Sequence, residues 1–335
     1  MVTMNPLLIT HAEDPDGIIS RSLLMRALFI DDKNPQDHVF VRYDRFAEAF
    51  QEAVEKAEQH DAIYVADLSV NDRLLQAEPE NCSLLDQLVA GKRAHWFDHH
   101  DGTMAHQKEL SARGIDIHYH KDHCASLLVA SYFSLGYPYE KTLVRVAQAN
   151  DYRSPVHEPD SLRLGNDLEK IIALLNEKPD YGLLLELSCA VRDEQCFDRE
   201  QRLLPPWQEL AEDFSRRESV AYAELEQSAE MISVGVQKII FGYASPLLAP
   251  KQGPDYLREQ YRDVADIFVC LFKPPVRNHL VFICEDSSFP VVPFVKGLGG
   301  GGRGTGGGFT LDYDVTPENY KQVKERLLDE IEKYS

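Results

Sequence analysis

The chain has 335 residues and a formal net charge of −20, with 44% hydrophobic and 27% charged residues. This is the composition of a soluble globular protein, and the length exceeds what one hydrophobic core usually supports, so we expect at least two domains. The acidic balance argues against a protein that binds long duplex DNA, because such proteins normally carry a basic stripe that neutralises phosphates.

Neither membrane insertion nor secretion is expected from the sequence. No apolar run approaches the roughly 20 residues that cross a bilayer, and no basic segment followed by an apolar run marks a signal peptide. The six cysteines form no CxxC pair, which is typical of thiols in a reducing compartment. We therefore expect a cytoplasmic protein without a disulfide framework or a zinc ribbon.

The negative charge is concentrated in the first part of the chain. Residues 1–235 contain 23 Lys and Arg against 42 Asp and Glu, a net of −19, whereas residues 236–335 contain 12 against 13, a net of −1. A small phosphorylated ligand is compatible with this distribution, because a few local cations or metal ions suffice to hold it.

Strand and helix patterns alternate through residues 1–155. Short apolar runs predict strands at 7–10, 38–42 and 62–66, in the run that ends at 98, and at 115–119. Helical spacing of apolar residues predicts helices at 18–29, 46–59, 81–91, 125–135 and 143–150. This alternation predicts an α/β domain built on a doubly wound, mostly parallel sheet.

The rest of the chain divides into two further parts. Residues 156–235 are rich in helix patterns (162–176, 181–196 and 204–231) and predict a helical connector without ligand-like spacing. Strand patterns return at 236–241, 266–272 and 279–284, with helices at 255–263 and 317–334. We therefore expect a smaller C-terminal α/β domain over residues 236–335.

Acidic and imidazole side chains recur where the predicted strands end. They are His11, Asp14 and Asp16 after the first strand, Asp67 after the third, Asp98-His99-His100 after the fourth, and Asp151 at a helix end. Each has an ordinary explanation alone, since Asp14 could cap a helix and His11 could be a core histidine. Their recurrence at one edge of a sheet favours a divalent metal site, because imidazole and carboxylate together suit such ions.

Together these residues resemble the motifs of the DHH phosphoesterase superfamily. This superfamily includes RecJ-type exonucleases, short-oligonucleotide ribonucleases, cyclic-dinucleotide phosphodiesterases and family II inorganic pyrophosphatases. Its first motif resembles His11 with Asp14-Pro15-Asp16, and its second resembles Asp67. The third resembles Asp98-His99-His100, and the fourth resembles Asp151.

The resemblance implies two divalent cations that activate a hydroxide for in-line displacement at phosphorus. It assigns one cation to His11, Asp14 and Asp67, and the other to Asp16, Asp67, His99 and Asp151. Mn²⁺ is the first expectation, with Mg²⁺ or Co²⁺ as substitutes. His100 would face the scissile phosphate, and Asp98 would orient an imidazole.

A glycine-rich run in the last part of the chain carries a second resemblance. Consecutive glycines let backbone N–H groups approach an anion closely. The run is similar to the glycine motif of the DHH-associated C-terminal domain, with Arg303 in place of the usual His. The resemblance implies a substrate-binding role for Gly300, Gly301, Gly302, Arg303 and Thr305. A Ser-x-Arg that family members often carry on the preceding strand is replaced by Cys284-Glu285-Asp286, so the substrate stays open.

The leading functional hypothesis is a phosphodiesterase that cleaves short oligonucleotides or linear dinucleotides to nucleoside monophosphates across an interdomain cleft. The alternatives are a 3′-phosphoadenosine 5′-phosphate phosphatase and a single-strand-specific, RecJ-like exonuclease. A pyrophosphatase fits less well because that family has another C-terminal domain, and a non-catalytic nucleotide sensor would lack a metal position. The expected partners are a short oligonucleotide or nucleotide substrate, without membrane or long-duplex DNA, and the chain is compatible with a homodimer.

Overall fold

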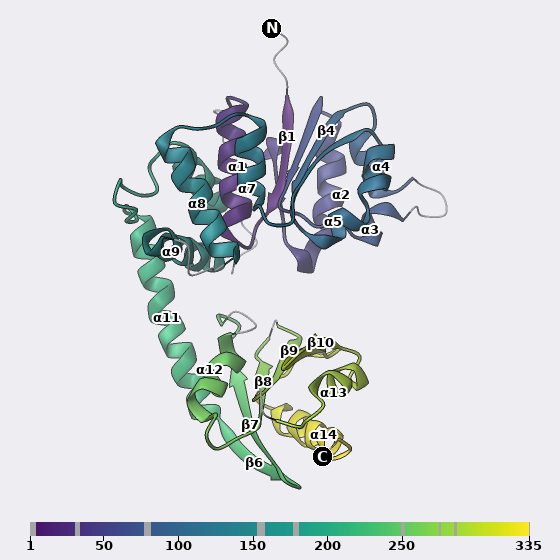
Figure 1. Cartoon of the computed structure of the whole chain (residues 1–335), viewed down its shortest axis with the longest axis vertical. Helices are drawn as coiled ribbons and strands as arrows, with labels where there is room; N and C mark the ends of the chain where they lie inside the picture. Colours follow the sequence, from purple (N-terminus) through teal and green to yellow (C-terminus); the bar gives the residue numbers. More distant parts are fainter. Residues whose placement is uncertain are drawn as a thin grey trace. The chain divides into compact units, whose positions relative to one another are not determined.

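The computed structural model describes residues 5–30, 34–76, 82–152, 158–176, 181–248, 252–274, 276–284 and 287–334. The chain forms two compact units, Met1–Phe214 and Ser215–Ser335. Each unit contains one β-sheet covered by helices (Figure 1).

The sheet of the first unit is parallel throughout and has the strand order β2-β1-β3-β4-β5. Its strands are β1 (Pro6–His11), β2 (His38–Val41), β3 (Ala62–Ala66), β4 (Arg93–Asp98) and β5 (Ile115–Tyr119). The predicted doubly wound α/β fold is therefore confirmed. The strand order reverses between β1 and β3, and ligands of doubly wound sheets bind at the carboxyl ends of strands at such a point.

Both faces of this sheet are buried, which explains why β1 is apolar along its length. Leu8 packs into a core with α1, whereas Leu7 and Ile9 pack into a second core on the opposite face with α2. The first face carries α1 (Pro15–Ala27), α7 (Ala125–Tyr132), α8 (Pro138–Tyr152), α9 (Pro159–Leu175) and α10 (Gly182–Arg192). The other face carries α2 (Phe46–Ala57), α3 (Asp72–Leu75), α4 (Leu84–Val89) and α6 (Gln107–Ala112), and the short α5 (Asp101–Ala105) follows β4.

The helices predicted as a connector are shared between the two units. Helices α9 and α10 contact α1, and their apolar residues belong to its hydrophobic core. Helix α11 (Trp207–Ser228) contributes Trp207 to that core and Leu225 to a core of the second unit. The packing therefore places the boundary at residues 214 and 215, whereas composition had suggested a separate segment over 156–235.

The second unit contains a mixed sheet with the order β10-β11-β9-β8-β7-β6. Its strands are β6 (Glu230–Val234), β7 (Gln237–Ala244), β8 (Ile267–Phe272), β9 (Asn278–Ile283), β10 (Gly301–Arg303) and β11 (Gly306–Thr310). Its helices are α12 (Gln252–Tyr261), α13 (Val291–Gly297) and α14 (Tyr320–Glu332). Residues 230 and 231 begin β6 rather than ending the preceding helix, because they pair with β7.

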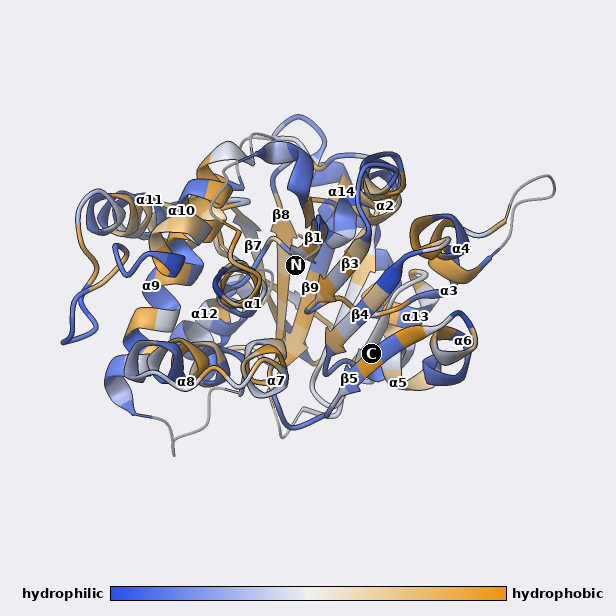
Figure 2. Ribbon diagram, turned by 90° about the horizontal axis from the view of Figure 1, so that it is seen from above, coloured by the Kyte–Doolittle hydropathy of each residue, from blue (hydrophilic) through white to orange (hydrophobic). Residues whose placement is uncertain are grey.

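Hydropathy follows the burial of these elements. Strand β8 is buried along its whole length and is coloured as hydrophobic in Figure 2. Helix α2 shows hydrophobic and hydrophilic stretches side by side in the same view, as an amphipathic surface helix does. In the part of the chain that the structure describes, no helix combines the length and apolar character needed to span a membrane.

One buried histidine predicts how the stability of the second unit depends on pH. The ring of His279 is fully buried, and its Nδ1 accepts a hydrogen bond from the Phe272 N–H at 3.1 Å. Burial lowers the pKa of His279 to about 4. In the unfolded chain this histidine has a pKa of about 6.5 and takes up a proton more readily. The stability contribution is therefore full above that pH and falls as the pH drops toward the folded pKa.

We expect the free energy of opening of β8 and β9 to fall by up to about 1.4 kcal/mol per pH unit in this window. Urea-dependent hydrogen exchange at pH 7.5 and 5, corrected for intrinsic rates, measures it. A His279→Asn variant keeps a hydrogen-bond acceptor without titrating, so its profile should be flatter. An equally steep profile in the variant would rule out His279 as the cause.

Candidate metal centre

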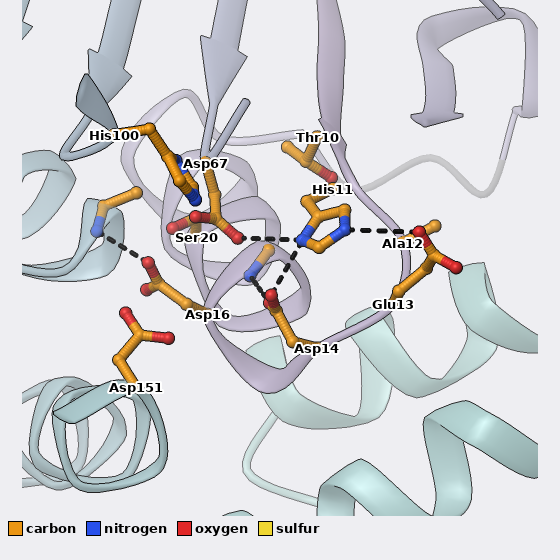
Figure 3. Close-up of polar contacts among 12 residues, drawn as sticks. Thr10, His11, Ala12, Glu13, Asp14, Asp16, Ser20, Asp67, His100 and Asp151 are labelled. Atoms are coloured by element: carbon orange, nitrogen blue, oxygen red, sulfur yellow. Dashed lines mark hydrogen bonds and ion pairs between the residues drawn. The ribbon is translucent and has the colours of Figure 1, made fainter. Parts of the chain in front are cut away.

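The first part of the site is the turn that joins β1 to α1. His11 is the last residue of β1, and Asp14 caps α1 by accepting a hydrogen bond from the Gly17 N–H at 3.0 Å. A Cβ atom on Gly17 would lie 2.2 Å from the His11 carbonyl oxygen, so the helix can start this close only with glycine there. The turn brings His11 Nδ1 to 2.7 Å from Asp14 Oδ2 (Figure 3).

Asp67 follows β3 and has a left-handed backbone, with φ 60°. Its N–H donates to the Phe97 carbonyl oxygen at 2.9 Å, which ties this turn to β4. The buried carboxylate lies between two histidines: Oδ2 is 3.3 Å from His11 Nδ1, and Oδ1 is 3.4 Å from His99 Nε2. Asp67 is therefore the one described carboxylate that contacts ligand candidates on both sides of the switch point.

His99 links β4 to the end of α8. Its Nε2 is 3.4 Å from Asp67 and 3.7 Å from Asp151 Oδ2. Its Nδ1 is 3.2 Å from the Tyr152 hydroxyl, which itself donates to the Lys121 carbonyl oxygen at 3.1 Å. Because that hydroxyl proton is used, the hydroxyl accepts from Nδ1–H, and the lone pair of neutral His99 is on Nε2, facing the two carboxylates.

His100 and Asp98 form a separate pair. Asp98 is buried, and its Oδ1 is 2.7 Å from His100 Nδ1. A hydrogen on Nδ1 leaves the other nitrogen of His100 available to a ligand. The resemblance implied that Asp98 orients an imidazole, and the imidazole that it contacts is that of His100.

The carboxylate of Asp16 accepts several hydrogen bonds from the start of α7. It accepts hydrogen bonds from the N–H groups of Ala125 at 2.6 Å and Ser126 at 2.9 Å, and from the Ser126 hydroxyl. These donors lie at the start of α7, so Asp16 also anchors that helix. Oδ1 accepts both bonds from Ser126 and Oδ2 accepts the one from Ala125, so Oδ2 keeps a lone pair. Atoms of Asp16, Cys124 and Asp151 lie within 4.8 Å of one another.

The pKa values of these groups record the crowding of negative charge. Burial, with repulsion from Asp67 and Asp14, raises the pKa of Asp16 to about 7. Burial, with repulsion from Asp16, raises the pKa of Asp151 to about 10. Burial works against a charged His99, yet its contact with Asp67 and the charge of Asp16 raise its pKa to about 9. In the metal-free protein, protons bound to these groups therefore neutralise part of the negative charge.

A divalent cation fits this donor set. Among the described residues, several buried atoms of the site make no hydrogen bond, including Asp67 Oδ2, Asp151 Oδ2 and His99 Nε2. Buried polar atoms without partners are costly, and a cation would satisfy them and displace the protons. Two groups have the composition of a metal site and share Asp67: His11, Asp14 and Asp67, and Asp67, Asp98, His99 and His100. In Figure 3 the carboxylates of Asp14 and Asp67 lie beside His11, and that of Asp151 lies beside Asp16.

Three residues near the site were not predicted from the sequence. Tyr152 orients His99, as described above. Cys124 contributes a buried thiol beside Asp16 and Asp151. Glu13 Oε2 lies 3.5 Å from His11 Nε2. The position of Tyr152 directly after Asp151 was the only sequence signal that could have indicated its place.

The tautomer of His99 gives a first test of the centre. Replacing Tyr152 by Phe removes the oxygen that accepts from Nδ1–H, and we expect metal affinity to fall by about 10–100-fold. Titration with Mn²⁺ followed by electron paramagnetic resonance measures the free ion. Tyr137→Phe, at an exposed position, is the matched control. Unchanged affinity in Tyr152→Phe would show that the hydroxyl does not orient His99.

The predicted substrate-binding residues lie in the second unit, on a hairpin of β10 and β11. Gly301, Gly302 and Arg303 pair with Gly308, Gly307 and Gly306. A Cβ atom on Gly300 or Gly302 would lie 2.0 or 2.5 Å from a backbone oxygen of the opposite strand, so those glycines are required by packing. A Cβ atom on Gly301 meets nothing within 4 Å. Thr305 follows Gly304 in the turn, and the side chain of Arg303 lies outside the described part.

The chain shares its fold with solved structures of DHH phosphoesterases. The residues that resemble the DHH motifs lie at or just after the carboxyl ends of β1, β3 and β4, except Asp151, which lies near the end of α8. No protein-family model and no curated protein sequence matches the chain. The evidence for the class therefore comes from solved structures, which confirm the resemblance suggested by the motifs at the level of the fold.

Solved structures with this fold include a phosphodiesterase and an exonuclease. The pGpG-specific phosphodiesterase PggH from Vibrio cholerae matches with a TM-score of 0.54 and 14% identity, over 98% of this chain and 100% of that one. The exonuclease RecJ bound to manganese matches with a TM-score of 0.57 and 14% identity, over 98% and 90% of the two chains. RecJ from Thermus thermophilus in complex with Mn²⁺ gives 0.52 at 14% identity, over 98% of this chain and 52% of that chain.

Proposed function

We propose that the protein is a divalent-metal-dependent phosphodiesterase that hydrolyses short oligonucleotides or linear dinucleotides to nucleoside monophosphates. The observation that carries the proposal is the position of Asp67 between the His11–Asp14 pair and His99. A carboxylate shared by two ligand sets is what a pair of adjacent cations requires. Mn²⁺ is the proposed ion, and two ions the proposed number.

The proposed ligand sets follow the contacts. His11, Asp14 and Asp67 would hold one ion, and Asp67, His99, Asp151 and Oδ2 of Asp16, which keeps a lone pair, would hold the other. Such a pair lowers the pKa of an intervening water and neutralises charge that develops on the phosphate. The protein positions these ions through the helix cap at Asp14, the left-handed turn at Asp67 and the hydroxyl of Tyr152.

His100 is the proposed group that meets the substrate. Asp98 holds its Nδ1–H and so presents the other nitrogen as a donor or acceptor. From there it would stabilise charge on the scissile phosphate or protonate the leaving oxygen, and such groups contribute about 10²–10⁴-fold to the rate.

A short substrate is proposed on grounds of charge. The first unit lies within the acidic part of the chain, and long single strands need a basic groove that follows the backbone. PggH, whose fold this chain shares, is described as pGpG-specific. Arg303 and the glycine hairpin are proposed to hold the phosphate or base of such a ligand. A cytoplasmic location remains a prediction.

The proposal is tested with the full chain, Mn²⁺ and four substrates given separately. These are a linear dinucleotide, a long single-stranded DNA, 3′-phosphoadenosine 5′-phosphate and inorganic pyrophosphate. We expect rapid conversion of the dinucleotide to monophosphates, seen by mass spectrometry and abolished by a chelator. Consumption of only the bisphosphorylated nucleotide, or of only the long strand, would replace the proposal by the corresponding alternative.

Substitutions at two adjacent glycines of the hairpin test ligand binding and packing separately. Gly301 has open space around its α-carbon, so Gly301→Ala should fold normally while raising KM for the dinucleotide by about 10-fold, through lost backbone access. Gly302→Ala should instead lower the thermal unfolding midpoint, since its Cβ would collide with β11. An unchanged KM in a stable Gly301→Ala variant would remove this residue from the binding site.

A further inference from the structure

A second cluster of possible ligands lies within β4 and β5 rather than in the turns that follow the strands. It consists of His95, Asp116 and His118 and shares no residue with the centre described above. Strands β4 and β5 are adjacent in the sheet (Figure 2), and the register pairs His95 with Asp116 and Phe97 with His118. Because side chains alternate along a strand, all three project from the same face.

Three atoms of this cluster form an equilateral triangle. His95 Nδ1 is 3.4 Å from His118 Nε2 and 3.4 Å from Asp116 Oδ2. His118 Nε2 is also 3.4 Å from Asp116 Oδ2. Ligands of a tetrahedral ion with bonds of about 2.0–2.1 Å lie about 3.3–3.4 Å apart, so the triangle has the dimensions of three corners of such a site.

Hydrogen bonding alone accounts poorly for this triangle. If both imidazoles donate to Asp116 Oδ2, their two N–H groups face each other at 3.4 Å. If one facing nitrogen carries no hydrogen, its lone pair faces a lone pair of the carboxylate, so one edge of the triangle is unfavourable in either case. One cation at the centre satisfies all three atoms together. The side chains of His95 and His118 are 14% and 18% exposed, so water reaches them only in part.

Aromatic rings fix the two imidazoles in this orientation. The His95 ring stacks on Tyr64 with a centroid distance of 5.0 Å, and the His118 ring stacks on Phe97 at 4.4 Å. Tyr132 of α7 contacts both imidazoles, at 5.3 and 4.4 Å. Imidazoles held in place lose little freedom when they bind a ligand, which favours affinity.

The protonation state also suits metal binding. Burial lowers the pKa of His95, and the nearby Arg93 adds to this effect although Asp116 opposes it. Burial also lowers the pKa of His118. Both rings are therefore neutral at physiological pH, and neutral imidazole is the form that metals bind.

We propose that His95, Asp116 and His118 form a second, separate site for a borderline divalent ion of the Zn²⁺ type. Two imidazoles and one carboxylate favour such an ion over Mg²⁺, which prefers oxygen ligands. With three protein ligands, a water molecule would complete a tetrahedral set. The bound ion would connect the edge strand β5 to β4.

The probe is Zn²⁺, offered to the full chain by equilibrium dialysis over a series of buffered free concentrations. Zinc per chain is counted by elemental analysis. We expect the wild type to bind one more equivalent than the double variant His95→Ala, His118→Ala. Asp116→Asn, at an exposed position, should weaken binding of that equivalent by at least about 10-fold.

A matched control is His106→Ala, because His106 forms a comparable surface pair with Asp72, at 3.5 Å, without a second imidazole. It should bind zinc as the wild type does. Equal zinc per chain in the wild type and the double variant at every free concentration would overturn the proposal. If the double variant does not fold, unchanged zinc affinity in Asp116→Asn decides against it instead.

Discussion

Replacing Asp67 by Asn is expected to lower kcat/KM by about a thousandfold while making the metal-free protein more stable. The loss follows from the position of Asp67, whose two oxygens each face a different histidine. Neutralising it removes the charge common to both proposed ion sites. Asn tolerates the left-handed backbone of this position, so the turn after β3 should keep its shape.

The gain in stability has a separate cause. Burial, with repulsion from Asp14, raises the pKa of Asp67 in the folded protein. A neutral amide of the same shape avoids the cost of this buried carboxyl group, and we expect the free energy of unfolding to rise by about 1–2 kcal/mol. Urea unfolding in the presence of a chelator measures it for the wild type and the variant.

The two readouts together test the role of Asp67. An inactive variant that is also less stable would indicate that Asp67 mainly supports the fold. A variant that keeps near-normal activity would contradict a shared carboxylate, and with it the two-ion proposal.

Replacing His100 by Ala is expected to lower kcat by about 10²–10³-fold with no change in the number of bound metal ions. The reason is that His100 Nδ1 contacts Asp98, which is not one of the proposed metal ligands. The other ring nitrogen of His100 can therefore act on the substrate. Single-turnover kinetics with the dinucleotide and elemental analysis of the loaded protein measure the two quantities.

Asp98→Asn is the companion variant. An amide oxygen can still accept from Nδ1–H, so we expect a smaller loss in kcat, about 10-fold, and unchanged metal content. If His100→Ala loses one metal ion per chain, His100 is a metal ligand and the proposed role at the phosphate is wrong.

Much of the first unit follows from sequence patterns, because each pattern has a local cause. The apolar runs of β1, β3 and β4 are read directly as strands buried on both faces. Asp14 is recognisable as a possible helix cap, although the helix begins at Pro15 rather than at the predicted residue 18. Parallel strands also end at one edge, so the approach of His11, Asp67 and His99 could be expected from the order of the strands and motifs alone.

Other features depend on contacts between distant residues and could not be predicted in this way. Asp16 anchors α7 through donors more than a hundred positions away. The tautomer of His99 depends on Tyr152. Helices α9 and α10 belong to the first unit because their apolar residues pack with α1, and composition alone does not reveal which element an apolar face packs against. The triangle around His95 requires the register of β4 and β5, which is set by the sheet as a whole.

The order of the proposed ligands along the chain has a consequence for synthesis. They begin at His11, the last residue of β1, and the last, Asp151, lies near the end of α8. A nascent chain therefore cannot assemble the centre until α8 has left the ribosome and packed. An ion that binds only the folded form stabilises it by about 2.7 kcal/mol when the free ion concentration is a hundred times the dissociation constant. Only chains that have folded the complete first unit would gain this stability. Truncated or misregistered products would lack it and remain open to proteolysis.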